Sequence, residues 1–136
     1  MRRPRQSRAT SACALTLWVV CGWAACAHGD EQVHSLEVTA TAYNSVLGQT
    51  NAEPTLTAWG DRLEPGMKSI AVSRDLIALG LEHGVTVEIE GLPHHYVVRD
   101  KMAKRWKRKI DIYMGDDVQA ARHWGRRKVT IRWRND

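Results

Sequence analysis

Cysteine is absent from the chain after residue 26. The three cysteines, Cys13, Cys21 and Cys26, all lie within the first 27 residues. Because we expect those residues to be removed as a leader, the remaining domain forms no internal disulfide and offers no thiolate to a nucleophile or a zinc site. Cysteine catalysis is therefore excluded for the mature chain.

The chain also lacks an apolar run that would span a bilayer. Residues 12–27 carry no charge, but this run is shorter than the roughly 20 residues that a membrane-spanning helix needs. Arginines precede it and Ala25-Cys26-Ala27 resembles a cleavage site, so we expect a signal peptide over residues 1–27 and export to the periplasm or cell envelope. Lipidation at Cys26, with outer-membrane association, is the less favoured alternative because Trp23 fits that signal poorly.

Net charge is nearly absent from the mature chain. Four of the twenty basic residues lie in the leader and all fifteen acidic residues lie after it, which leaves a net charge of +1. Residues 28–98 carry three basic and ten acidic side chains, whereas residues 99–136 carry thirteen and five. The second part is expected to form a cationic surface, which is either merely solvated or binds cell-wall carboxylates or another anionic partner. Export argues against nucleic acid.

The histidines show no metal-binding pattern. His94-His95 and His123 do not form a pair at helical spacing with a glutamate between them, so we expect no metal site.

Short alternating segments predict a mainly-β domain. Six of them bear β-branched or aromatic residues, which indicates a small closed or nearly closed barrel. The predicted strands are residues 36–43, 69–73, 85–90, 96–98, 110–113 and 128–133. We expect a flexible segment over residues 28–35 and one domain over residues 36–136.

Two short helices are predicted between these strands. Asp116 and Asp117 are typical of a helix start, and Gly125 of its end. A second helix is expected over residues 74–79, with Ser73 as its cap and Gly80 after it.

Asp100 and Asp111 are the strongest catalytic candidates. Each ends or interrupts a predicted strand, and the polar segment between them, residues 101–109, is typical of a return loop. Two nearby carboxyl groups do not ionise independently, so one of them can stay protonated and act as a general acid on a glycosidic bond. The alternative is that each aspartate caps a turn or pairs with a neighbouring arginine or lysine.

Several separate motifs together resemble the 3D domain, named for its three aspartates. Their order and spacing cover nearly all of the mature chain. The motifs are Thr41-Ala42-Tyr43-Asn44, Thr57-Ala58-Trp59-Gly60, Ile70-Ala71-Val72-Ser73, Leu79-Gly80, Val98-Arg99-Asp100, Ile110-Asp111-Ile112-Tyr113-Met114-Gly115, Ala120-Ala121 and Trp124-Gly125.

This resemblance implies a six-stranded double-psi β-barrel, as in barwin, expansins, rare lipoprotein A and membrane-bound lytic transglycosylase A. It implies that the partner is the glycan strand of peptidoglycan, cleaved between N-acetylmuramic acid and N-acetylglucosamine without a cofactor. It also implies that Asp100 and Asp111 form the catalytic pair. Thr41 and Tyr43 would position the substrate, although packing of the strand is the alternative reading. A monomer is expected.

The chain departs from the family pattern at two places. Ser73 stands where the family has its first aspartate, and Lys101 follows Asp100 where the family has Asp-Thr-Gly. Both residues are expected to lie at the substrate site. A lysine beside Asp100 would lower the pKa of that carboxyl unless its side chain points away. Three interpretations therefore stay open: a lytic enzyme, a non-catalytic peptidoglycan-binding module, and an interaction protein with a cationic face.

Overall fold

The computed structural model describes residues 32–45 and 55–135. The predicted signal peptide and most of the predicted segment 28–35 lie outside the described residues. The elements, in chain order, are β1 (Val33–Tyr43), β2 (Ser69–Val72), α1 (Arg74–Ile77), β3 (Thr86–Ile89), β4 (His95–Lys101), β5 (Lys109–Tyr113), α2 (Val118–Trp124) and β6 (Arg127–Arg134).

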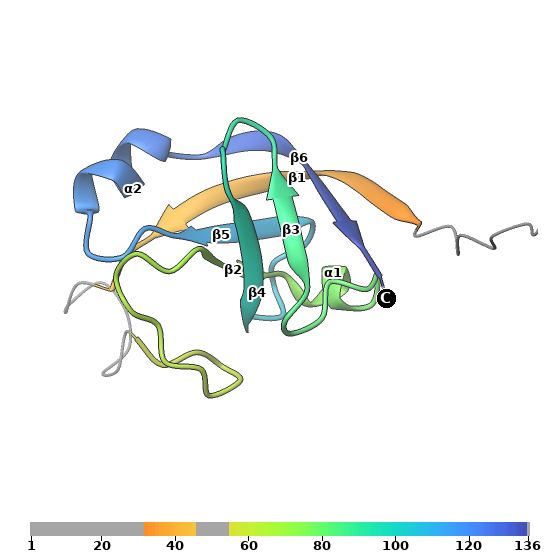
Figure 1. The fold of residues 1–136 in the computed structure, drawn as a ribbon, viewed down its shortest axis with the longest axis horizontal. Helices are drawn as coiled ribbons and strands as arrows, with labels where there is room; N and C mark the ends of the chain where they lie inside the picture. Colours follow the sequence, from red (N-terminus) through yellow and green to blue (C-terminus); the bar gives the residue numbers. More distant parts are fainter. Residues whose placement is uncertain (1–31, 46–54, 136) are drawn as a thin grey trace, which may run out of the picture.

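The six strands form a closed barrel in the order β1-β5-β2-β4-β3-β6 (Figure 1). β1 with β5 and β2 with β4 are parallel pairs, and the other neighbours are antiparallel. Among these six strands, only β3 and β4 are neighbours both in the sequence and in the barrel. The predicted fold class, a mainly-β six-stranded barrel with two short helices, is confirmed.

Alternation along the strands explains why the barrel closes. In β3 and β6 apolar residues point inward at every second position while polar residues point outward, as a strand with one buried face requires. The interior is fully aliphatic at its centre. Its residues with no exposed surface include Ala40, Ile70, Val72, Val87, Val98, Ile110, Ile112 and Ile131.

Strand β1 begins at Val33, earlier than the predicted start at Leu36. Its first residues pair with the end of β6, where Val33 lies opposite Arg134 and His34 opposite Trp133. The rings of His34 and Trp133 stack with their centroids 5.2 Å apart. Residues 33–35 therefore belong to the barrel rather than to a flexible segment.

Helix α2 has the predicted cap at each end and lies at one end of the barrel (Figure 1). The Asp117 carboxylate accepts a hydrogen bond from the Ala120 backbone N–H at 2.8 Å. Gly125 ends the helix with φ of 65°, where a residue without a side chain is favoured. Arg127 then donates to the Trp124 carbonyl at 2.6 Å and so satisfies a free helix-end acceptor.

Helix α1 is shorter than predicted and is capped differently. It ends at Ile77, and Ser73 lies at its N-cap position without a side-chain hydrogen bond to the helix. The Ser73 hydroxyl instead accepts from the Lys109 backbone N–H at 3.0 Å. Ser73 thus links the end of β2 to the start of β5.

Within residues 32–45 and 55–135, no helix is both long enough and apolar enough to cross a membrane.

Candidate functional site

Strand register brings the two candidate aspartates to one face of the barrel. Ala71 of β2 pairs with Asp111 of β5 on one side and with Asp100 of β4 on the other. Asp111 in turn pairs with Thr41 of β1. The four residues Thr41, Asp111, Ala71 and Asp100 form one row across four adjacent strands, which we call the aspartate row.

The aspartate row lies on the outer face of the barrel. Its members alternate along their strands with core residues that have no exposed surface, such as Ala40, Ile110 and Ile70. Adjacent strands are about 4.8 Å apart, so the Cα atoms of Asp100 and Asp111 lie roughly 10 Å apart across Ala71. Ala71, which is 5% exposed, places only a methyl group between these two strands' carboxyl groups.

A β-bulge places Asp100 in this row. Ile70 pairs with Val98, but the next residue, Ala71, pairs with Asp100, so that Arg99 is the extra residue. In a regular ladder Ala71 would face Arg99, and Asp100 would point into the core beside Val98. Bulges redirect side chains in this way and are common next to active sites.

Asp100 is anchored by backbone donors. Its Oδ1 atom accepts from the Ala58 N–H and from the Lys101 N–H, each at 2.8 Å. The first of these bonds fastens the loop before β2 to the aspartate row. The second is a local bond that holds the carboxylate against its own strand end.

Asp111 is the residue with the altered proton affinity. Burial raises its pKa above the ordinary value of 3.8, and the negative charge of Asp100 adds to that increase. The Thr41 hydroxyl, which donates to Asp111 Oδ1 at 2.9 Å, and the Lys109 ammonium oppose the increase without cancelling it. Asp111 is therefore easier to protonate than an ordinary aspartate.

Tyr43 lies on the same face, two residues beyond Thr41. Burial, followed by the charges of Asp100 and Asp111, raises the pKa of its hydroxyl well above 10.0, so the group stays protonated. The hydroxyl is buried and has no hydrogen-bond partner among the residues that the structure describes. Its ring lies against Tyr113, with centroids 5.4 Å apart. The Tyr43 hydroxyl is thus a buried group, close enough to both carboxylates for their charges to affect its pKa.

Lys101 points away from Asp100. Its ammonium lies over the Trp59 ring, 5.5 Å from the centroid. In the described part of the chain, no lysine or arginine lies within the 4.0 Å ion-pair distance of either Asp100 or Asp111. The alternative that each aspartate is neutralised in a structural ion pair therefore does not apply there.

Ser73 is the predicted site residue that stays apart from the others. Its side chain has no exposed surface, and its hydroxyl is used by the backbone N–H of Lys109. A substrate would have no surface of Ser73 to touch. Ser73 therefore contributes to the fold by linking β2 to β5.

Trp59 and Lys109 are neighbours of the site that the sequence did not single out. Lys109 precedes Asp111 by two residues on the same face, is 9% exposed, and places its ammonium 3.6 Å from the Trp106 ring centroid. One face of the Trp106 ring is therefore covered by a cation. Trp59 contacts His83 edge to face with centroids 5.2 Å apart, and His83 pairs with Asp61 of the same loop. The spacing of these residues in the sequence does not predict these contacts.

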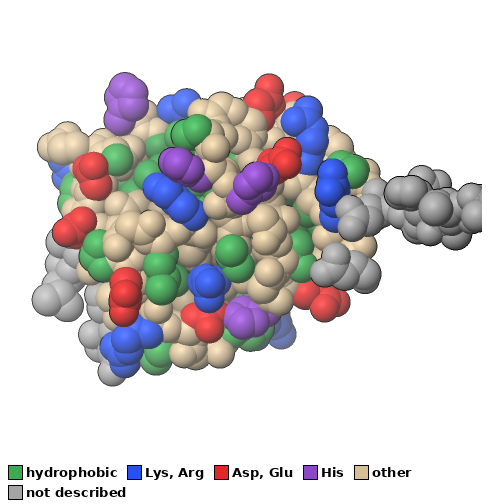
Figure 2. All heavy atoms as spheres, in the orientation of Figure 1, with side chains coloured by type: hydrophobic (Ala, Val, Ile, Leu, Met, Phe, Trp, Pro, Cys, Tyr) green, Lys and Arg blue, Asp and Glu red, His purple; other side chains and the backbone are tan. Residues whose placement is uncertain are grey.

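The cationic second half of the chain does not form a continuous basic patch on the face shown in Figure 2. Basic, acidic and histidine side chains are interspersed there. Elsewhere Lys128 pairs with Glu37 at 3.4 Å, and Arg127 lies over Trp124. The expectation of one cationic surface is therefore not met on this face.

A metal centre finds no support among residues 32–45 and 55–135, because no three metal-ligating side chains cluster there.

No protein-family model matches the chain, and no curated protein sequence does so. Among solved structures, a mutant expansin of Clavibacter michiganensis in complex with cellohexaose is 16% identical, with a TM-score of 0.44 over 74% of this chain and 49% of the expansin chain. The apo expansin is 17% identical with the same score and coverage. The chain thus spans about half the length of these expansins, and a likeness this distant carries no argument about function. Membership of the 3D-domain family stays a prediction.

The structure predicts that Ser73 stabilises the fold rather than contacting substrate. Ser73→Ala would leave the buried Lys109 N–H without its side-chain acceptor and should lower the free energy of unfolding by about 1–3 kcal/mol in urea titrations. Ser69→Ala is the matched control, because Ser69 is equally buried and its hydroxyl has no partner in the described structure. Equal stability of the two variants would contradict this role.

The negative charge of Asp100 should affect the titration of Asp111. In carbon-detected NMR the Asp111 carboxyl should titrate with a midpoint above 3.8. Asp100→Asn removes a negative charge and should lower that midpoint, whereas Thr41→Val removes a donor to the carboxylate and should raise it. Asp116→Asn, an exposed aspartate outside the row, is the control. An unchanged midpoint in Asp100→Asn would show that the pair is not coupled.

Proposed function

We propose that this protein is an exported enzyme that cleaves the glycosidic bond between N-acetylmuramic acid and N-acetylglucosamine in peptidoglycan, by the lytic transglycosylase reaction. The observation that carries the proposal is the placement of Asp100 and Asp111 on one face of the barrel, in register on either side of Ala71, with the pKa of Asp111 raised by burial. Export to the periplasm or envelope, predicted from the leader, would place the protein with this substrate.

The reaction needs one group that donates a proton and later accepts one. Protonated Asp111 would donate its proton to the glycosidic oxygen while the bond from that oxygen to C1 of the muramic acid breaks. The C6 hydroxyl of the same sugar then attacks C1, and the Asp111 carboxylate takes the hydroxyl proton. A 1,6-anhydro ring forms, no water is consumed, and Asp111 returns to its protonated state.

The neighbours of Asp111 fit supporting roles in this reaction. Asp100, fixed by two backbone N–H groups, would stabilise the positive charge that develops at C1. Thr41 holds the Asp111 carboxyl in place through its hydroxyl. Tyr43 would support the site by packing against Tyr113, since its hydroxyl is buried.

The loop beside Asp100 would supply the sugar contact. Trp59 follows Ala58, whose N–H binds Asp100, and its partly buried side chain packs against the core. Aromatic rings beside carboxylates suit the apolar faces of sugars, and Lys101 is close enough to Trp59 to meet a polar substituent of the same sugar.

A non-catalytic peptidoglycan-binding module is the second candidate. It is favoured by Ser73, which replaces an aspartate of the family pattern and is fully buried, and by the use of Asp100 Oδ1 in two backbone hydrogen bonds. Such a module would bind insoluble peptidoglycan and release nothing.

Muropeptide analysis separates these candidates. Incubation of the mature protein with peptidoglycan should release fragments with 1,6-anhydromuramic ends, identified by mass spectrometry. Asp111→Asn should reduce the rate by at least about 100-fold, because it removes the general acid while keeping the shape of the side chain.

Asp116→Asn is the control and should release fragments at the rate of the unaltered protein. Sedimentation of the protein with peptidoglycan and no fragment release would favour the binding module. Equal release by Asp111→Asn would contradict the catalytic assignment.

A further inference from the structure

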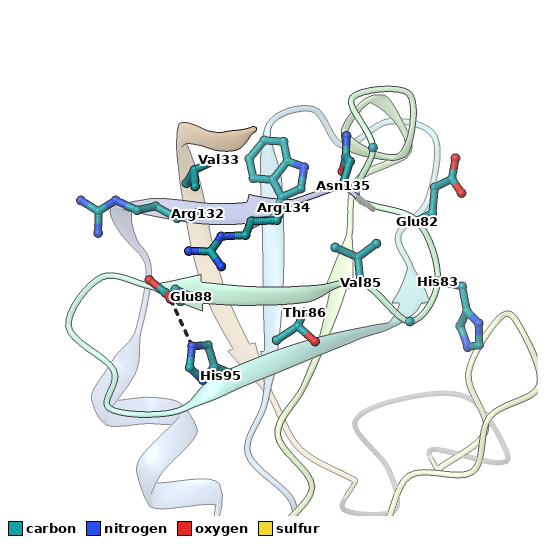
Figure 3. Close-up of a pocket in the computed structure, with 13 residues that line it drawn as sticks. Val33, Glu82, His83, Val85, Thr86, Glu88, His95, Arg132, Arg134 and Asn135 are labelled. Carbon is teal, nitrogen blue, oxygen red and sulfur yellow. Dashed lines mark hydrogen bonds and ion pairs between the residues drawn. The ribbon is translucent and has the colours of Figure 1, made fainter. Parts of the chain in front are cut away.

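A polar hollow lies on the barrel away from the aspartate row. Its volume is about 960 Å³, and it is lined by residues of β3, β4 and β6 and of the turn before β3. In Figure 3, Arg132, Glu88 and His95 lie towards one end of it, and Glu82 and His83 towards the other, with Arg134 between them. Nothing in the reaction described above uses these residues.

Side chains of both charges line the hollow. In the strand ladders, Glu88 of β3 lies opposite Arg132 of β6 and opposite His95 of β4. The Glu88 carboxylate lies 3.1 Å from His95 Nε2. Arg134 lies two residues beyond Arg132, about 7 Å along the same strand and on the same face.

These charges exclude several classes of ligand. Glu82 and Glu88 would repel a polyanion such as a nucleic acid or an anionic membrane surface. A neutral sugar chain would need an aromatic platform, but Trp133, the one tryptophan lining the hollow, is only 5% exposed. A short peptide that carries both carboxylates and an ammonium matches a hollow lined by two arginines and two glutamates.

The hollow is linked to the loop beside Asp100 through one ring contact. His83 lines the hollow, and its ring lies 5.2 Å from that of Trp59. Trp59 follows Ala58, whose N–H binds Asp100. In peptidoglycan a short peptide stem is attached to the lactyl group of muramic acid, so a glycan strand lying over the aspartates would bring a stem towards His83.

We infer that the hollow binds the peptide stem of peptidoglycan, so that the protein acts on strands that carry stems. This inference rests on the proposed function. The arginines of β6 would bind the stem carboxylates, and Glu82 or Glu88 its free amine. Valine side chains at its rim, Val33 and Val85, would contact the alanine methyl groups.

Titration of ¹⁵N-labelled protein with an isolated tetrapeptide stem tests this inference. Amide shifts should move in the turn before β3 and in β3 and β6, and the neutral sugar chitotetraose should leave those shifts unchanged. Arg132→Ala should weaken stem binding by about threefold and the double variant Arg132→Ala/Arg134→Ala by about tenfold, because each exposed charge contributes little alone. Arg122→Ala, an exposed arginine on α2, is the control.

Two outcomes would overturn the inference: a stem that shifts no amide of the hollow, or a double variant that binds the stem as tightly as the unaltered protein. Failure of this inference and failure of the proposed function would give different results. Release of anhydromuropeptides without any stem binding would leave the function standing and remove the hollow as a subsite. Stem binding without fragment release would support the hollow and count against catalysis.

Discussion

The candidate site depends on how one strand is paired on both its sides. Ala71 of β2 lies between Asp111 and Asp100, and the bulge at Arg99 sets the second of these pairings. A shift of one residue in either ladder would turn a carboxylate into the aliphatic core, where an unpaired charge is not tolerated. The closed barrel therefore fixes the positions of Asp100 and Asp111 together with its own interior.

The same arrangement gives the two aspartates different properties. Asp111 is partly buried and close to another negative charge, which raises its pKa. Asp100 is bound to two backbone N–H groups at the end of its strand. Two carboxyl groups in unequal environments are the pattern by which enzymes separate an acid from a charge stabiliser.

Much of this fold follows from alternation in the sequence. The strands around residues 36–43 and 128–133, and the caps Asp117 and Gly125, were predictable because each depends on local periodicity or turn chemistry. Convergence of Asp100 and Asp111 was predictable from their strand-end positions. Three other features could not be predicted, because they depend on partners distant in sequence. These are the bulge at Arg99, the burial of Ser73 and the contact of Lys101 with Trp59.

A crystal structure of Asp111→Asn with a peptidoglycan strand fragment would test the central claim most directly, because this variant should bind the strand without cleaving it. The account predicts a muramic acid residue over Ala71, with the glycosidic oxygen within hydrogen-bond distance of the Asn side chain and C1 facing Asp100. A strand bound on another face of the barrel, with residues 100 and 111 untouched, would contradict it.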